Sequence, residues 1–328
     1  MQVRSPRPPR QRVDGVLLLD KPSGLSSNAA LQRARRALNA EKAGHTGTLD
    51  PLASGLLPLC FGEATKFARF LLDADKRYTA TVRFGTTTTT QDAEGDVVAT
   101  ALVNLDRAAI EAALPAFRGT ILQVPPAFSA LKHQGRSHYE YARAGIDVPR
   151  AAREVRIAAL ILTAWNSPDA MLDVECSKGT YIRALAADLG DALGCGAHLA
   201  ALRREGTGGF SIDDAVTLDA LEALPPDAQM RALLPVDALL AELPRLAVDA
   251  ADAQRLRDGR AIGASGCVPE SARMAGGQRP AGFGAHAPAE HCPPAMRYRV
   301  YAPDGALLGV VTRDGDVLSP ERMTRTLT

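Results

Sequence analysis

The chain has no surplus of positive charge to mark it as a nucleic-acid-binding protein. Its 328 residues include 38 Lys and Arg against 37 Asp and Glu, a formal net charge of +1. Because the charge as a whole exerts no pull on a polyanion, any contact with RNA has to come from local basic patches. Compositional extremes are also absent, and 46% hydrophobic residues predict one large or two ordinary globular domains.

Cysteine and long apolar runs are scarce as well. The five cysteines are an odd number scattered over a long chain, which does not indicate a disulfide framework. No apolar run is long enough for the core of a signal peptide or for a membrane span, so neither is expected. A reducing cytoplasm is the simplest location that these absences leave.

Neither a metal site nor a phosphate-binding loop is predicted. Cys195 and His198, and the adjacent His291 and Cys292, do not supply the four clustered ligands of a closed zinc site. The glycine-rich stretch 206–209 lacks the lysine and the strand-to-helix context of a phosphate loop. We therefore expect no cofactor and no metal.

One stretch, residues 44–57, places a single carboxylate on a glycine-punctuated loop among apolar residues. Pro51 disfavours the helical conformation at Asp50 and so restricts how the carboxylate is presented. Neighbouring leucines are expected to shield it from water: Leu49, Leu52, Leu56 and Leu57. A carboxylate in such a setting must be paired or lose its charge. The sequence therefore predicts a cationic partner for Asp50 elsewhere in the chain.

Arg183 is the candidate for that cation. It follows Lys-Gly-Thr-Tyr-Ile at residues 178–182 and lies in the first turn of a predicted helix, where a positive charge opposes the helix dipole. Its position therefore favours an anionic partner. A bidentate pair with Asp50 would hold that carboxylate ionised and aimed, and an ordinary surface arginine is the alternative.

Hydrophobic periodicity predicts the elements around these residues. Strands are expected at 16–19, 76–84 and 171–177, and a helix is expected to begin near Ser26 or Ser27. In the strand 76–84, Tyr78 shares the apolar face with Ala80, Val82 and Phe84, the ordinary position of a half-buried core residue. For the stretch around Leu202, the plain end of a helix is an alternative that stays open.

Two basic stretches offer possible RNA contacts. Residues 1–12, with four arginines and three prolines, cannot form a core and are expected to be a disordered tail. Residues 120–156 hold six Lys or Arg against three acids, interleaved with aromatic side chains, which suits phosphate pairing and base packing. A solvated, irregular insertion is the alternative for 120–156. Two interpretations are equally open for the arginines of the first predicted helix: phosphate contact or a solvated helix face. These arginines are Arg33, Arg35 and Arg36.

The C-terminal part, residues 245–328, has the pattern of a small β-barrel. Short strands are predicted at 297–301, 307–312 and 317–318, joined by Asp-Gly turns. The stretch 263–296 is rich in Gly, Ala and Pro and is predicted to be a mobile insertion.

Several motifs together resemble the TruB-type family, the tRNA pseudouridine-55 synthases. The string Gly-His-x-Gly-Thr-Leu-Asp-Pro, ending at Pro51, is the context of that family's essential aspartate. The Lys-Pro-x-Gly opening at Lys21, the strand that contains Tyr78 and the string that ends at Arg183 also match. So does Pro-Pro-x-Phe-Ser-Ala-x-Lys, although Phe128 occupies a position where the family more often has Tyr.

The resemblance implies an α+β fold with a mixed, largely antiparallel sheet. A catalytic domain would span residues 13–244, with an RNA-contacting arm at 120–156, and a PUA-like RNA-binding module would span 245–328. The implied catalytic residues are Asp50, Tyr78 and Arg183. The implied substrate-binding residues are His45, Lys21, Tyr181 and Leu202; a merely structural role for His45 is equally open.

The implied reaction converts a uridine in the T-loop of tRNA, uridine-55, to pseudouridine. It breaks an N-glycosidic bond, turns the uracil and rejoins it to the ribose through carbon, so nothing is oxidised or added. Whether Asp50 attacks the ribose or abstracts a ribose proton stays open. A monomer that binds the tRNA T-arm is expected. The alternatives are a pseudouridine synthase for another RNA and a non-catalytic RNA-binding or chaperone protein.

Overall fold

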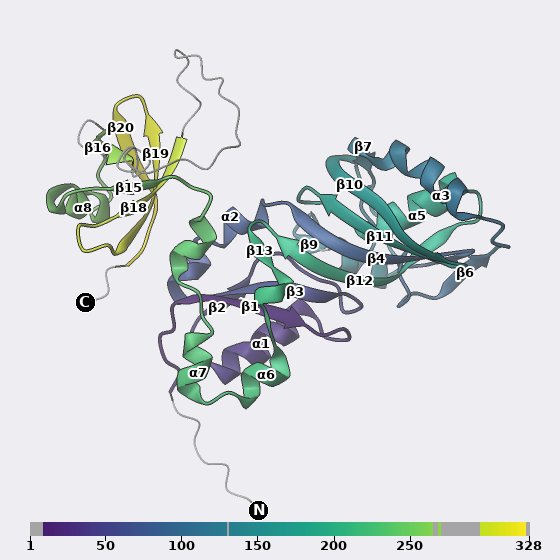
Figure 1. Cartoon of the computed structure of the whole chain (residues 1–328), viewed down its shortest axis with the longest axis horizontal. Coiled ribbons are helices and arrows are strands. Elements are labelled where there is room, and N and C mark those ends of the chain that lie inside the picture. The colour runs from purple at the N-terminus through teal and green to yellow at the C-terminus, as the bar shows by residue number, and fades with distance from the viewer. Residues whose placement is uncertain (1–8, 130, 265–267, 270–295, 326–328) are drawn as a thin grey trace, which may run out of the picture.

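The computed structural model describes residues 9–129, 131–264, 268–269 and 296–325, which form an α+β fold with a large and a small sheet (Figure 1). The large sheet runs in the order β14 (Val216–Thr217), β1 (Gly15–Lys21), β3 (Ser54–Phe61), β12 (Ala197–Thr207), β4 (Lys76–Phe84), β11 (Asp169–Cys176), β10 (Arg153–Asn166) and β7 (Gly119–Gln123). Beside it, β2 (Ala43–His45) pairs with β3, and β13 (Phe210–Ser211) pairs with β12.

The pairing in the large sheet is mixed and largely antiparallel, as predicted. Only β1 with β14 and β3 with β12 run parallel among its described strands. The central strand β4 shows why the sequence adopts this form: Ala80, Val82 and Phe84 alternate inward, whereas Arg77 and Arg83 are exposed. The predicted bounds of this strand, 76–84, are confirmed.

The helices lie in two groups, each over its own part of the core. One group is α3 (Arg107–Ala113), the 3-10 turn η2 (Leu114–Phe117) and α5 (Ile182–Ala192), and the other is α1 (Ser27–Ala37), α6 (Leu218–Ala223) and α7 (Pro226–Arg231). The Ser26 side chain caps α1 by accepting a hydrogen bond from the Ala29 amide, which confirms that predicted start. Tyr78 and Leu202 pack against both cores, so they lie at the seam between the two groups.

The residues around Leu202 form the strand β12, so the alternative of a helix end is wrong. Leucine, alanine and arginine favour helices locally. Here β12 pairs with β4 along nearly its whole length and with β3 at Arg203 and Arg204. Tertiary pairing therefore overrides local propensity.

Two basic segments have partners within the chain. Arg33 donates to Glu222 through Nε (2.9 Å) and Nη2 (2.7 Å), which favours a structural role on α1 over phosphate contact. Of the predicted N-terminal tail, residues 1–8 lie outside the described residues. The Gln11 amide donates to the Asn39 carbonyl at 2.9 Å, so the chain is anchored to the loop after α1 from there onward.

Several shorter elements complete this part of the fold. They are the hairpin β5 (Thr86–Thr88) with β6 (Val97–Thr100), the hairpin β8 (Lys132–His133) with β9 (Arg136–Ser137), α2 (Ala68–Leu72), α4 (His138–Arg143), and the 3-10 turns η1 (Gly62–Lys66), η3 (Ile212–Asp214) and η4 (Val236–Leu240).

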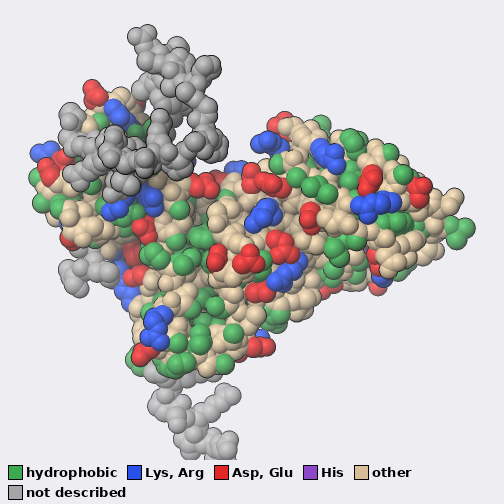
Figure 2. Space-filling view, in the orientation of Figure 1, with side chains coloured by type: hydrophobic (Ala, Val, Ile, Leu, Met, Phe, Trp, Pro, Cys, Tyr) green, Lys and Arg blue, Asp and Glu red, His purple; other side chains and the backbone are tan. Residues whose placement is uncertain are grey.

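The face of the large sheet away from the two cores is open and carries both signs of charge. Along β11, exposed and buried residues alternate. Met171, Asp173 and Glu175 are exposed, and the residues between them are buried. Figure 2 shows acidic side chains gathered in the middle of the molecule among scattered Lys and Arg. No continuous basic surface covers this view. Within the described residues, no helix is long and apolar enough to cross a membrane.

The C-terminal sheet has a core of its own. Its order is β16 (Ile262–Gly263), β20 (Val317–Met323), β19 (Leu307–Asp314), β18 (Met296–Tyr301), β15 (Arg245–Ala247) and β17 (Val268–Pro269), and α8 (Ala250–Arg257) packs against it. Figure 1 shows this curled sheet beside the large one. The three predicted strands are confirmed, and most of the predicted insertion 263–296 lies outside the described residues.

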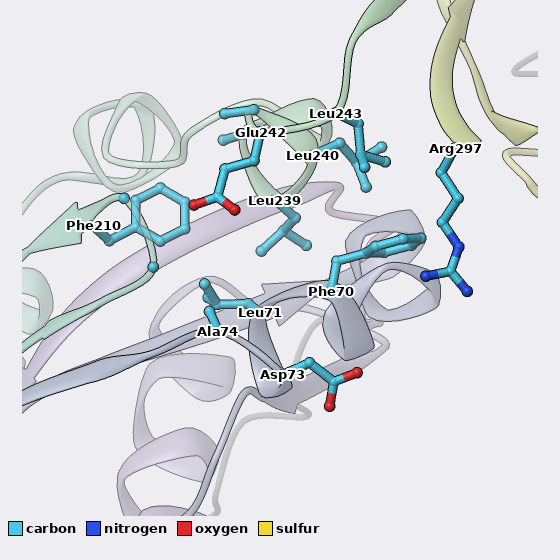
Figure 3. Close-up of a pocket in the computed structure, with 14 residues that line it drawn as sticks. Phe70, Leu71, Asp73, Ala74, Phe210, Leu239, Leu240, Glu242, Leu243 and Arg297 are labelled. Atoms are coloured by element: carbon cyan, nitrogen blue, oxygen red, sulfur yellow. The ribbon is translucent and has the colours of Figure 1, made fainter. Parts of the chain in front are cut away.

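One ion pair joins the C-terminal sheet to α2, and a second lies within the sheet. Glu321 pairs with Arg69 of α2 and with Arg297 of β18, the latter at 2.9 Å from Nε to Oε2. The Arg297 guanidinium lies 5.9 Å from the centroid of the Phe70 ring and points toward it (Figure 3). A cavity of about 280 Å³ opens beside this contact, between α2 and η4. None of its lining residues belongs to the Asp50 loop.

Candidate active site

Asp50 lies in the loop between β2 and β3, and α1 holds that loop from one side. The Ser27 hydroxyl donates to the Leu49 carbonyl and accepts from the Leu49 amide, both at 2.8 Å. On the other side of Asp50, the Gly24 amide donates to the Pro51 carbonyl at 2.8 Å. Backbone atoms immediately before and after Asp50 are therefore fixed to the start of the first helix.

Gly55, at the start of β3, shows why glycine is needed where the Asp50 loop ends. Its φ is +99°, and a Cβ there would lie 2.3 Å from the Arg204 carbonyl oxygen. A side chain would force β3 away from β12, to which it pairs in parallel at this point. The close approach of the two strands sets where the Asp50 loop ends.

The cation predicted for Asp50 is present. The Arg183 Nε lies 3.0 Å from Asp50 Oδ2, and the Arg183 side chain is only 6% exposed. Its Nη1 donates to the Thr90 carbonyl at 3.0 Å and its Nη2 to the Phe128 carbonyl at 2.8 Å. Because the two terminal nitrogens are engaged by backbone, the guanidinium cannot swing away from Asp50.

Two details of that prediction were wrong. The Asp50 side chain is 44% exposed, so the leucines do not enclose it. Only Nε of Arg183 faces it, so the pair is not bidentate. The reason is that the carbonyls of Thr90 and Phe128 take the terminal nitrogens. A carboxylate that is held on one side and open on the other remains available to a substrate.

Asp92 is the part of the site that the motifs do not reveal. Its Oδ2 lies 3.5 Å from Arg183 Nε, and its side chain is 5% exposed. Its Oδ1 accepts from the Thr90 hydroxyl at 2.5 Å and from the Glu94 amide at 3.0 Å. Arg183 therefore lies between two carboxylates, one accessible and one buried. In the sequence, Asp92 is one acid within the polar stretch 86–95, and nothing there marks it as buried.

Tyr78 and Arg204 are a cross-strand pair on β4 and β12. Arg204 is 1% exposed; its Nε donates to the Leu56 carbonyl at 2.7 Å and its Nη2 approaches the Gly47 carbonyl at 3.5 Å. Burial raises the pKa of the Tyr78 phenol, and the Arg204 guanidinium opposes this. Asp50 also acts on this phenol, so Tyr78 lies within the field of both charges.

Lys21 and His45 are held inside the same loop region. Lys21 is 0% exposed, and its Nζ donates to the carbonyls of Pro22 (2.9 Å) and Leu25 (2.6 Å). Burial lowers its pKa to about 8, although Asp50 acts in the opposite direction. Lys21 thus holds the turn, and this position does not support direct contact with RNA. Burial, aided by Arg204, lowers the pKa of His45, so its imidazole is neutral at pH 7.

Tyr181 precedes α5 and is fixed by Gln123 of β7. The Tyr181 amide donates to Gln123 Oε1 at 2.7 Å, and Gln123 Nε2 donates to the Tyr181 carbonyl at 3.0 Å. Burial raises the pKa of the Tyr181 phenol, on which Arg183 and Asp50 both act. Asp50, Tyr78, Arg183 and Tyr181 are therefore brought to one place.

The arm at 120–156 carries arginines stacked on tyrosines. The Arg143 guanidinium lies 4.4 Å from the Tyr139 ring centroid, and Arg136 lies 5.0 Å from Tyr141. The arm is tied to the site because the Phe128 carbonyl accepts from Arg183. Among the residues described, no group of three or more His, Cys, Asp or Glu could hold a metal ion.

Comparison with protein families matches the chain in two adjoining parts. Residues 35–182 match the TruB family pseudouridylate synthase N-terminal domain, and residues 183–241 match the tRNA pseudouridylate synthase B C-terminal domain. The tRNA pseudouridine synthase B of Burkholderia mallei (strain ATCC 23344) is 53% identical over 99% of both chains. That of Thiobacillus denitrificans is 51% identical over 98% of this chain and 99% of its own length. The chain belongs to the TruB family of pseudouridine synthases.

Solved structures agree on the fold. A chain in the crystal structure of a Cbf5–Nop10–Gar1 complex is 24% identical, with a TM-score of 0.69 over 94% of this chain and 84% of that one. A chain of an H/ACA RNP bound to a substrate RNA is 22% identical, with a TM-score of 0.68 over 95% and 85%. The C-terminal sheet fits the PUA-like module of this fold, as predicted.

Proposed function

We propose that the chain converts a uridine of tRNA to pseudouridine and that the target is uridine-55 in the T-loop. The observation that carries this proposal is the half-exposed Asp50 carboxylate held by a buried Arg183. The names of relatives more than 50% identical over nearly the whole chain support tRNA as the substrate. The motif around Asp50 supports the T-loop.

Each side chain of the site has a part in the proposed reaction. Asp50 is the group that starts the exchange, either by attacking the ribose or by removing a ribose proton. Arg183 holds and aims this carboxylate, and Tyr78 lies against the base. Tyr181 and Leu202 line the pocket, and His45 occupies the space that the flipped uridine leaves.

The isomerisation balances without any other reactant. The N1–C1′ bond breaks, the uracil turns, and a C5–C1′ bond forms. C5 then loses a proton and N1 gains one. Groups that exchange protons and one carboxylate suffice for these steps, and the described site contains both.

RNA binding is assigned to two regions. The arm 120–156 presents its arginines and tyrosines close to Arg183, and the module 245–328 adds phosphate contacts to the catalytic domain 13–244. We propose that the chain acts as a cytoplasmic monomer on the tRNA T-arm.

A single-turnover assay with enzyme in excess tests the proposal. An unmodified T-arm hairpin should be converted by the chain alone, and a hairpin from ribosomal RNA should not. In cells that lack the protein, pseudouridine should disappear from position 55 of tRNA. Conversion of the ribosomal hairpin alone would favour the other-RNA alternative, and tight binding without conversion would favour a non-catalytic protein.

A further inference from the structure

Arg204 is a buried cation for which no described acid forms an ion pair. Among the residues that the structure describes, its guanidinium is held by two backbone carbonyls, those of Leu56 and Gly47. The adjacent Arg203, by contrast, makes two contacts with the Asp20 carboxylate, at 3.1 and 2.9 Å. A buried charge that lacks a counter-charge is costly. We therefore ask whether the charge of Arg204 has a role in the reaction.

The strand register places that charge next to Tyr78. Arg204 and Tyr78 are directly opposed on antiparallel strands, so their side chains share one face of the sheet. The other groups that act on the phenol are Asp50, from the loop, and Cys176, from β11. Burial raises the pKa of the Cys176 thiol to about 11, which leaves it neutral at pH 7. Arg204 is therefore the cation that faces Tyr78.

The proposed reaction needs a proton acceptor near the base, because C5 must lose its proton once the C5–C1′ bond has formed. A phenol accepts a proton readily only as the phenolate, and an ordinary tyrosine loses its proton near pH 10. We propose that Arg204 is a positioning residue that stabilises the ionised form of Tyr78 for this transfer while it holds the Asp50 loop. The inference rests on the proposed function and deepens it.

Fluorine NMR of the full chain, labelled with 3-fluorotyrosine, measures the ionisation directly. The Tyr78 signal is the one that Tyr78→Phe removes, and the fluorine substituent lowers the pKa of the phenol. Arg204→Met should move the titration midpoint of Tyr78 upward, and each unit reduces the ionised fraction about tenfold. Arg204→Lys, which keeps the charge, should restore most of the shift.

A matched control is Lys76→Met. Lys76 is also a buried cation bound to backbone carbonyls, and it lies two residues from Tyr78 on β4. Its loss should leave the Tyr78 midpoint in place. Should Arg204→Met not fold, as judged by circular dichroism, Arg204→Gln replaces it in every measurement. An unchanged Tyr78 midpoint in the folded variant would overturn the inference.

Single-turnover rates provide a second, independent readout. Arg204→Met should lower the rate about tenfold or more at neutral pH and move its pH profile to higher pH. In a Tyr78→Phe background the same change should lower the rate by a clearly smaller factor, because only the contacts with the Asp50 loop are then lost. Losses that multiply in the double variant would show that Arg204 does not act through Tyr78. If the unaltered chain made no pseudouridine, the proposed function would fail, and the NMR titration would still decide the pairing.

Discussion

Replacing Asp92 by Asn tests whether the Arg183 guanidinium depends on both carboxylates. The substitution keeps the size of the side chain and the oxygen that accepts from the Thr90 hydroxyl and the Glu94 amide. It removes the charge from the position that lies 3.5 Å from Arg183 Nε. The loop should therefore stay in place while Arg183 loses one of its two anions.

The expected magnitude follows from burial. Removing one partner of a buried ion pair costs about 3–5 kcal/mol when the other charge is left alone. Arg183 keeps Asp50 at 3.0 Å, so we expect a smaller loss in the free energy of unfolding, about 1–3 kcal/mol. A displacement of Arg183 and Asp50 of about 1 Å should lower the single-turnover rate by roughly 100-fold. Affinity for a T-arm hairpin should hardly change.

The assay combines denaturant unfolding with single-turnover conversion of the T-arm hairpin. Asp169→Asn is the matched control, because its carboxylate makes two 2.7 Å contacts with Arg83 on the exposed face of the sheet. Asp169→Asn should lower the free energy of unfolding by less than about 1 kcal/mol and should not change the single-turnover rate. A folded Asp92→Asn chain with the unaltered rate would refute the role assigned to Asp92.

Four further outcomes are expected. Asp50→Asn should abolish conversion with enzyme in excess and leave hairpin binding largely intact; any product from the folded variant would sink the mechanism. Tyr78→Phe should lose rate by ~100-fold or more with little loss of affinity, and near-normal turnover would restrict Tyr78 to packing. Truncation after Pro244 should raise the tRNA dissociation constant and flatten its salt dependence; equal binding at every salt concentration would contradict the module assignment. Because the pKa of Lys21 falls from 10.5 to about 8 on folding, the unfolded state binds more protons between those values. The unaltered chain should therefore gain stability over Lys21→Met as the pH rises from about 8 towards 10.5, and a constant difference would argue against a buried charge.

Much of the fold could be predicted because local pattern and tertiary environment agree. In β4, alternation of apolar and polar residues matches a strand with one buried face, and its bounds came out as expected. The pairing of Asp50 with Arg183 could also be predicted from local features. Asp50 has apolar neighbours and Arg183 lies in the first turn of a helix, and each position favours a partner of opposite charge. Neither prediction required knowledge of the topology.

The missed features depend on contacts that no local pattern records. Asp92 reaches Arg183 because the segment around it pairs with Leu199, more than a hundred residues further along the chain. The strand β12 is rich in residues that favour helices, and its pairing with β3 and β4 makes it a strand. Arg204 therefore could not be placed opposite Tyr78 in advance.

The position of β4 between β11 and β12 has a consequence for how the protein matures. Its two neighbours come from residues 169–176 and 197–207, so the central strand stays unpaired until late in synthesis. Closing such long loops is slow, because chain entropy is lost before the stabilising contacts between the strands form. A nascent or clipped chain that ends before β12 contains Asp50, Tyr78 and Arg183 and yet lacks Arg204 and the strand that supports the loop. We expect such fragments to be inert, so that catalytic activity reports completion of the whole sheet.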